Sequence, residues 1–113
     1  MAVNLTRPVR SLTETERKLK ALNKDINGML HVLASYKKHP ETERTFFTKE
    51  KCEKELALAY HQKLQFLYPK VEALYQSTIM AACNGELGLK LLVKHGFIET
   101  CGVADNGEKL YAI

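Results

Sequence analysis

The stretch "KLLVKHGFIETCGVADNGEKLYAI", residues 90–113, decides how this chain completes its fold. It starts with a helical pattern and reaches Gly96, a residue type that commonly ends helices. Two short apolar runs follow at 97–101 and 109–113, separated by an Asp-Asn-Gly sequence. Asn and Gly tolerate positive φ, so this sequence favours a tight turn. The stretch therefore predicts the end of a helix followed by a β-hairpin.

The residues just before this stretch predict that the helix begins near residue 86. Asn84-Gly85 breaks the preceding pattern, and Asn84 is a suitable N-cap. The order of helix, glycine, strand, glycine-bearing turn and strand resembles the end of winged helix-turn-helix domains, over residues 84–113 or about a quarter of the chain. The resemblance implies that this helix is a recognition helix, that 69–83 supplies the preceding helix and that the hairpin is a wing. It also implies nucleic-acid contacts by Lys90, Lys94 and Lys109.

The chain departs from that family in the side chains of the expected recognition helix. Major-groove recognition needs Arg, Asn or Gln side chains that reach base edges, whereas this helix offers only Lys90, Lys94 and the terminal His95. Lys109 stands beside the acidic Glu108 in the wing. The alternative is therefore a helix and hairpin that only cover the core of the protein.

A long helix is predicted from residue 12 to residue 38. Residues 11–14, "SLTE", form a capping box. The apolar residues that follow recur with gaps of three and four, as on one face of a packed helix: Leu19, Leu22, Ile26, Met29, Leu33 and Tyr36. Residues 1–11 lack this period, and Pro8 disfavours helical backbone at the preceding residue. We therefore expect an extended or frayed N-terminal arm.

A second long helix is predicted from Lys49, with Thr48 as its N-cap. Its apolar stripe continues through Pro69 to about Ala82. Because proline removes a helical hydrogen bond and clashes with the preceding turn, two outcomes are open. The helix either continues with a kink, or it breaks at Tyr68 and a new helix begins at Pro69. Two long helices joined by a short loop are expected to pack antiparallel.

Together these elements predict one mainly α domain of 113 residues. It consists of the arm at 1–11, a helical hairpin at 12–83, and a short third helix with a β-hairpin at 84–113. Phe46 and Phe47 in the interhelical loop are expected to cover one end of the core. The two apolar seams leave surface that the chain itself does not fill, which predicts a homo-oligomer.

Basic residues are concentrated in the first half of the chain. Residues 1–51 hold 11 Lys and Arg against 6 Asp and Glu, whereas residues 52–113 hold 6 against 7. Clustered basic side chains attract phosphates, although a solvated helix face is the alternative. We expect any phosphate contacts to come first from the arm and the first helix: Arg7, Arg10, Arg17, Lys18, Lys20 and Lys24.

Other functional classes lack support in the sequence. The three cysteines form no CxxC pair, and free thiols are typical of the cytoplasm. A zinc site formed by Cys83, His95 and Cys101 would not have a standard ligand spacing, so neither a metal nor a cofactor is expected. Nucleotide-binding and catalytic motifs are missing as well, so we do not expect an enzyme. Without an 18-residue apolar run or an apolar leader, neither a membrane span nor a signal peptide is expected.

Two functions remain as hypotheses. The first is a small intracellular regulatory protein, for example in transcription regulation, that binds DNA or RNA through the winged-helix-like element and the basic first helix. The second is a protein-binding adaptor or inhibitor that uses the helical hairpin, or the region near Pro69, and has no nucleic-acid role. Affinity that falls steeply with salt would distinguish the first from the second.

Overall fold

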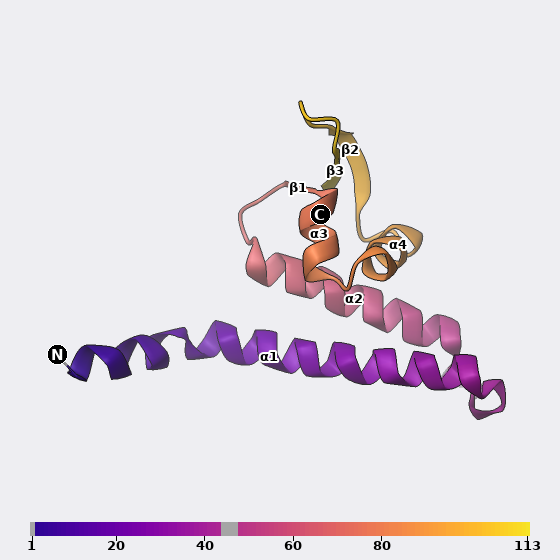
Figure 1. Ribbon diagram of the computed structural model, residues 1–113, viewed down its shortest axis with the longest axis horizontal. Helices are drawn as coiled ribbons and strands as arrows, with labels where there is room; N and C mark the ends of the chain where they lie inside the picture. Colours follow the sequence, from indigo (N-terminus) through magenta and orange to yellow (C-terminus); the bar gives the residue numbers. More distant parts are fainter. Residues whose placement is uncertain (1, 44–47) are drawn as a thin grey trace.

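The computed structural model describes the backbone of residues 2–43 and 48–113 and, within these ranges, the side chains from residue 14 onward. This part of the chain contains four α-helices, one 3-10 helix and a three-stranded antiparallel sheet. The predicted fold class is confirmed: mainly α, with an antiparallel pair of long helices, a short helix and a C-terminal β-hairpin (Figure 1). Phe46 and Phe47 lie outside the described residues.

The two long helices are α1 (Ala2–Lys38) and α2 (Lys49–Leu67), and the 3-10 helix η1 (Pro40–Thr42) follows α1. The predicted seam forms the contact between them, because residues three and four apart share one helix face. Its buried members include Ile26, Leu33, Leu56, Tyr60 and Leu64. Thr48 is the N-cap of α2, as predicted: its hydroxyl accepts the Lys51 N–H at 3.2 Å.

The beginning of α1 corrects one expectation. An extended or frayed arm is predicted at 1–11, but the structure places residues 2–11 inside α1. The bias against helical backbone before proline is a preference that helices can override, and α1 runs through Pro8. The capping box predicted at 11–14 therefore does not start the helix. The side chains of two predicted phosphate contacts lie outside the described residues, namely Arg7 and Arg10.

The chain after α2 corrects a second expectation. α2 ends at Leu67, and the Tyr68 N–H closes it by donating to the Leu64 carbonyl at 2.8 Å. A turn then leads to strand β1 (Ala73–Tyr75) and helix α3 (Gln76–Ala82). The predicted break at Tyr68 is therefore confirmed, whereas a kinked continuous helix and a new helix beginning at Pro69 are both wrong. The helical hairpin assigned to 12–83 ends at Leu67.

A tight turn joins α3 to the short helix α4 (Glu86–Lys94). Asn84 and Gly85 have φ of 60° and 71°, and the Gly85 N–H donates to the Met80 carbonyl at 2.8 Å. This hydrogen bond closes the end of α3. The N-cap of α4 is Gly85, so the N-cap predicted at Asn84 is wrong. The Asn84 Oδ1 instead accepts the Tyr60 hydroxyl at 2.9 Å, which ties the turn to α2.

Gly96 stops α4, as predicted: it follows the C-cap His95 and has a φ of 77°. The Phe97 N–H donates to the Leu92 carbonyl at 2.9 Å across this end. The predicted hairpin follows as β2 (Glu99–Val103) and β3 (Lys109–Ala112), which pair antiparallel. β1 pairs with the other side of β3, so the strand order is β1-β3-β2. The sheet thus joins the two ends of the helix-turn-helix unit formed by α3 and α4.

α2 lies between two parts of the molecule. α1 packs along one side of α2, and α3 and α4 pack against its other side (Figure 1). The molecule measures 58 × 38 × 19 Å, so it is long and thin. A functional surface on the outside of α1 is consequently separated from one on α4 or the hairpin by the thickness of α2.

Candidate nucleic-acid interface

The outer face of α1 carries a row of basic side chains. Arg17, Lys20 and Lys24 are exposed and lie three and four positions apart, so they share one face of the helix. Ile26, nine residues or two and a half turns after Arg17, is buried against α2 on the opposite side. The three basic residues line a shallow hollow of about 580 Å³ together with Ala21, Asn23 and Asn27.

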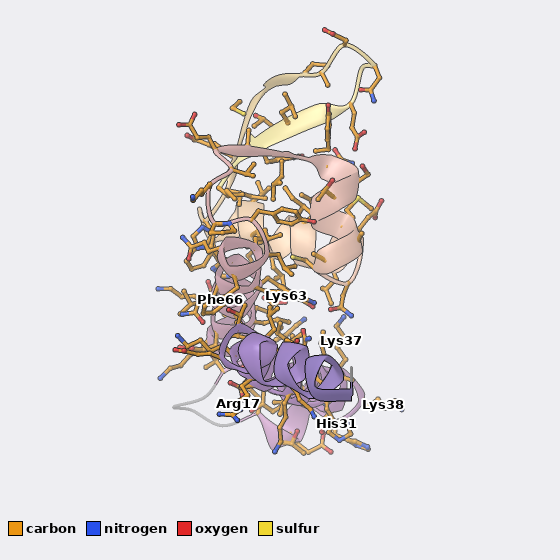
Figure 2. All side chains as sticks on the ribbon, turned by 90° about the vertical axis from the view of Figure 1, so that its left-hand side faces the viewer. Arg17, His31, Lys37, Lys38, Lys63 and Phe66 are labelled. Atoms are coloured by element: carbon orange, nitrogen blue, oxygen red, sulfur yellow. The ribbon has the colours of Figure 1, made fainter. Side chains whose placement is uncertain are left out.

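The same face continues toward the C-terminal end of α1. Arg17 and His31 project from the side of α1 that faces away from α2, and Lys38 is also exposed there (Figure 2). From Arg17 to Lys38 the helix rises by about 30 Å. We refer to this surface as the outer ridge, and define it as Arg17, Lys20, Lys24, Asn27, His31 and Lys38.

Carboxylates border the outer ridge without interrupting it. Glu16 precedes Lys20 by one turn and lies at the ridge's edge, whereas Glu14 and Asp25 lie on the flank of α1. Glu14 is 3.9 Å from the Lys18 Nζ. The ridge therefore presents an excess of positive charge along one line, which is the arrangement that attracts a phosphate backbone.

Lys18 belongs to a different surface from the residues with which the sequence grouped it. Its Nζ lies 5.7 Å from the centre of the Phe66 ring on α2 and 3.9 Å from a Glu14 carboxylate oxygen. A cation over an aromatic ring is attracted by the ring's electrons. Lys18 therefore contributes to the contact between α1 and α2, while Arg17 and Lys20 face solvent.

The lysines that the winged-helix resemblance assigns to nucleic acid are close to carboxylates. The Lys90 Nζ lies 3.9 Å from Glu86 within α4, and the Lys94 Nζ lies 3.4 Å from Glu53 on α2. Lys109 follows Glu108 at the start of β3. The structure does not bring these lysines together with the outer ridge, because α2 lies between them (Figure 1).

Glu108 has a structural contact that the sequence does not reveal. Its carboxylate accepts the Ser77 backbone N–H at 2.7 Å, so the hairpin holds the first turn of α3. Hydrogen bonds from the Ser77 side chain and backbone hold the pKa of Glu108 below its ordinary value. The Glu108 N–H in turn donates to the Asn106 Oδ1 at 2.9 Å. Glu108 thus connects the β2–β3 hairpin to the first turn of α3.

The exposed face of α4 is poor in groups that could read bases. Leu87 is 37% exposed and Val93 is 46% exposed, and these apolar residues alternate with Lys90 and Lys94. Neither Arg, Asn nor Gln occurs on α4. This face can contact a phosphate or an apolar partner, but it lacks the bidentate donors and acceptors of direct base readout.

The cysteines and histidines do not assemble into a metal-binding site in the described part of the chain. No group of three His, Cys, Asp or Glu residues there could hold a metal ion. Cys52 and Cys83 are buried, and burial raises the pKa of the Cys83 thiol to about 12. Thiols with a raised pKa are poor nucleophiles at neutral pH. Among the described helices, none is both long and apolar enough to cross a membrane.

Comparison with protein-family models, with curated proteins and with solved structures finds no significant match to this chain.

Proposed function

We propose that this chain is a nucleic-acid-binding protein that contacts the phosphate backbone through the outer ridge of α1. The observation that carries the proposal is the alignment of Arg17, Lys20 and Lys24 on one exposed face, opposite the buried seam. Their spacing presents three cations along a line, and the ridge of about 30 Å is close to one turn of a B-form duplex, about 34 Å. Asn23 and Asn27 add hydrogen-bonding groups beside the same hollow.

The proposed binding is largely independent of base sequence. Contacts to phosphates position a protein on a duplex but carry no base information. The helix-turn-helix and wing resemble those of winged helix-turn-helix domains, yet the exposed face of α4 offers two lysines near carboxylates and two apolar residues. We therefore assign the main phosphate contacts to α1 and a supporting role to the winged element.

A non-enzymatic regulatory protein of the cytoplasm, for example in transcription regulation, would use general affinity for nucleic acid in this way. The unpaired state of Cys52, Cys83 and the exposed Cys101 supports a reducing compartment.

A titration with fluorescently labelled duplex DNA and RNA at low salt tests the proposal. The variant Arg17→Ala/Lys20→Ala/Lys24→Ala is expected to bind about tenfold more weakly or worse, because three phosphate contacts are lost. The matched triple variant Lys90→Ala/Lys94→Ala/Lys109→Ala is expected to lose less. Lys18→Ala serves as a single-site control, because Lys18 lies over Phe66 rather than on the ridge.

The outcomes separate the alternatives. A larger loss from the Lys90, Lys94 and Lys109 variant would move the interface to α4 and the wing. A loss of binding free energy from Lys18→Ala that is about one third of the loss from the ridge variant would reduce the effect to net charge alone, because Lys18→Ala removes one charge and the ridge variant removes three. Failure of the unmutated protein to bind either nucleic acid at low salt would overturn the proposal.

A protein-binding adaptor or inhibitor without a nucleic-acid role is the second candidate. The observation that favours it is a group of exposed apolar side chains around the turn after α2: Phe66, Leu67, Val71 and Tyr75. Clustered exposed apolar residues are typical of protein contacts. In that case affinity purification after nuclease treatment would still recover the same partner protein, and salt would have little effect on the interaction.

A further inference from the structure

One flank of the α1–α2 pair contains a second feature, which shares only Lys24 with the outer ridge. A groove of about 740 Å³ runs between the two helices, and its α1 side includes Gly28, Met29 and Val32. Met29 and Val32 are only partly buried, although they lie next to the core. We refer to this feature as the α1–α2 groove.

The described residues leave this groove open. Figure 1 looks down the shortest axis of the molecule, along which it extends 19 Å, and shows α1 and α2 side by side. A helix with its side chains is about 10–12 Å across, so the helix pair is one layer thick. A Cβ at Gly28 would have no described neighbour within 4 Å. Gly28 therefore permits a close approach that no other described part of the chain makes.

Charged side chains are distributed unevenly along the groove. The Cys52 Sγ lies 3.6 Å from the Met29 carbonyl oxygen, which sets the register of the two antiparallel helices. Lys51 therefore lies toward the Val32 end of the groove, and Glu55, one turn further along α2, lies toward the Asp25 end. One end of the groove thus carries Lys51, and the other carries the carboxylates of Asp25 and Glu55 beside Lys24.

We propose that a second copy of this chain docks in the α1–α2 groove to form a two-fold symmetric homodimer. A two-fold axis makes residue i of one copy face residue j of the other and the reverse. An axis near Gly28 brings the Lys51 end of one groove against the Asp25 and Glu55 end of the second copy's groove. The charges are then complementary in both halves of the interface, and the apolar floor formed by Met29 and Val32 is covered.

A charge-reversal experiment with light scattering tests the dimer. The unmutated protein is expected to approach twice 12.8 kDa as its concentration rises. Lys51→Glu and Glu55→Lys should each raise the dimer dissociation constant by about tenfold or more, because each places like charges face to face in both halves of the interface. An equimolar mixture of the two variants should regain dimers, since in the mixed dimer the altered residues attract each other.

The equimolar mixture of Lys51→Glu and Glu55→Lys distinguishes a lost dimer contact from misfolding. Circular dichroism melts of both variants check that each remains folded, and the regained dimer cannot arise from misfolding. The proposal is overturned if the unmutated protein stays at 12.8 kDa throughout, or if two folded variants fail to associate when mixed. Both variants keep Arg17, Lys20 and Lys24, so a failure of the dimer and a failure of nucleic-acid binding are measured separately.

Discussion

Gly88 offers a sharp test of the helix-turn-helix packing. It is the third residue of α4, and a Cβ added there would overlap the carbonyl oxygen and the Cβ of Cys83, the residue that ends α3. Because the obstacle includes backbone atoms, no side-chain rotation can relieve it. Gly88→Ala therefore forces the start of α4 away from the end of α3.

The expected magnitude follows from two opposing effects. Alanine is preferred to glycine inside a helix by up to about 1 kcal/mol. Overpacking a close contact costs about 1–3 kcal/mol, and sometimes more. Since the overlap involves rigid backbone, we expect the clash to dominate and the free energy of unfolding to fall by about 2 kcal/mol. With an unfolding entropy of about 2.1 cal/mol/K per residue, this corresponds to a fall in Tm of roughly 8 °C for the 113-residue chain.

Gly28→Ala is the matched control for this prediction. Gly28 also lies within a helix, but a Cβ there would meet nothing within 4 Å in the described structure. The free energy of unfolding of Gly28→Ala should therefore rise by about 0.5–1 kcal/mol, measured at concentrations below those at which the proposed dimer forms. Urea denaturation measured by circular dichroism compares the two variants. An equal gain in stability from both substitutions would refute the close packing of α3 on α4.

Three further predictions concern stability. Leu64→Ala should lower the free energy of unfolding in urea by about 2–5 kcal/mol because Leu64 is fully buried, and Leu22→Ala should lower it less because Leu22 is half-buried. A larger loss from Leu22→Ala would contradict the assignment of Leu64 to the core. The contact with Ser77 lowers the pKa of Glu108 in the folded protein, so this contact stabilises the fold above the ordinary pKa of 4.5 and stops doing so as the pH falls through the pKa of the folded state. Glu108→Gln should therefore flatten the dependence of stability on acid pH. An unchanged pH profile of stability would rule the contact out. Burial lowers the pKa of His61, so the folded protein should lose stability as the pH falls below 6.5. Thermal melts of His61→Leu should no longer show this loss. If the variant still loses stability below pH 6.5, another group is responsible.

Local signals in the sequence predict several elements correctly. Thr48 caps α2 through its own hydroxyl, and Gly96 ends α4 with a positive φ, so each feature depends on a few neighbouring residues. The turn at 104–108 likewise follows from Asn106 and Gly107. Such features are readable because the interactions that cause them lie within one turn of the chain.

β1 could not be predicted in the same way. Its Leu74 is buried opposite Tyr111 of β3, a partner 37 positions later in the chain. Leu67 and Val71 continue the helical spacing of α2, but they are 39% and 42% exposed. Their spacing therefore misleads, because the pairing of the strand with β3 outweighs the local period.

Only part of the candidate site could be predicted from the sequence, because some of its contacts join residues that are far apart in the chain. Helical spacing could have separated Lys18 from Arg17 and Lys20, since adjacent residues point about 100° apart around a helix. The pairing of Lys94 with Glu53 spans 41 positions. No local pattern contains it, so only the folded structure shows that this lysine is close to a carboxylate.

The salt dependence of nucleic-acid binding tests the central claim most directly. The logarithm of the association constant should fall linearly with the logarithm of the salt concentration, with about 0.9 unit of slope for each phosphate contact to B-form DNA. Replacing Arg17, Lys20 and Lys24 by alanine is expected to flatten this slope by about 2.7 units, three times the value for one contact. An unchanged slope for that variant, or no binding by the unmutated protein at low salt, would contradict the assignment of phosphate binding to the outer ridge.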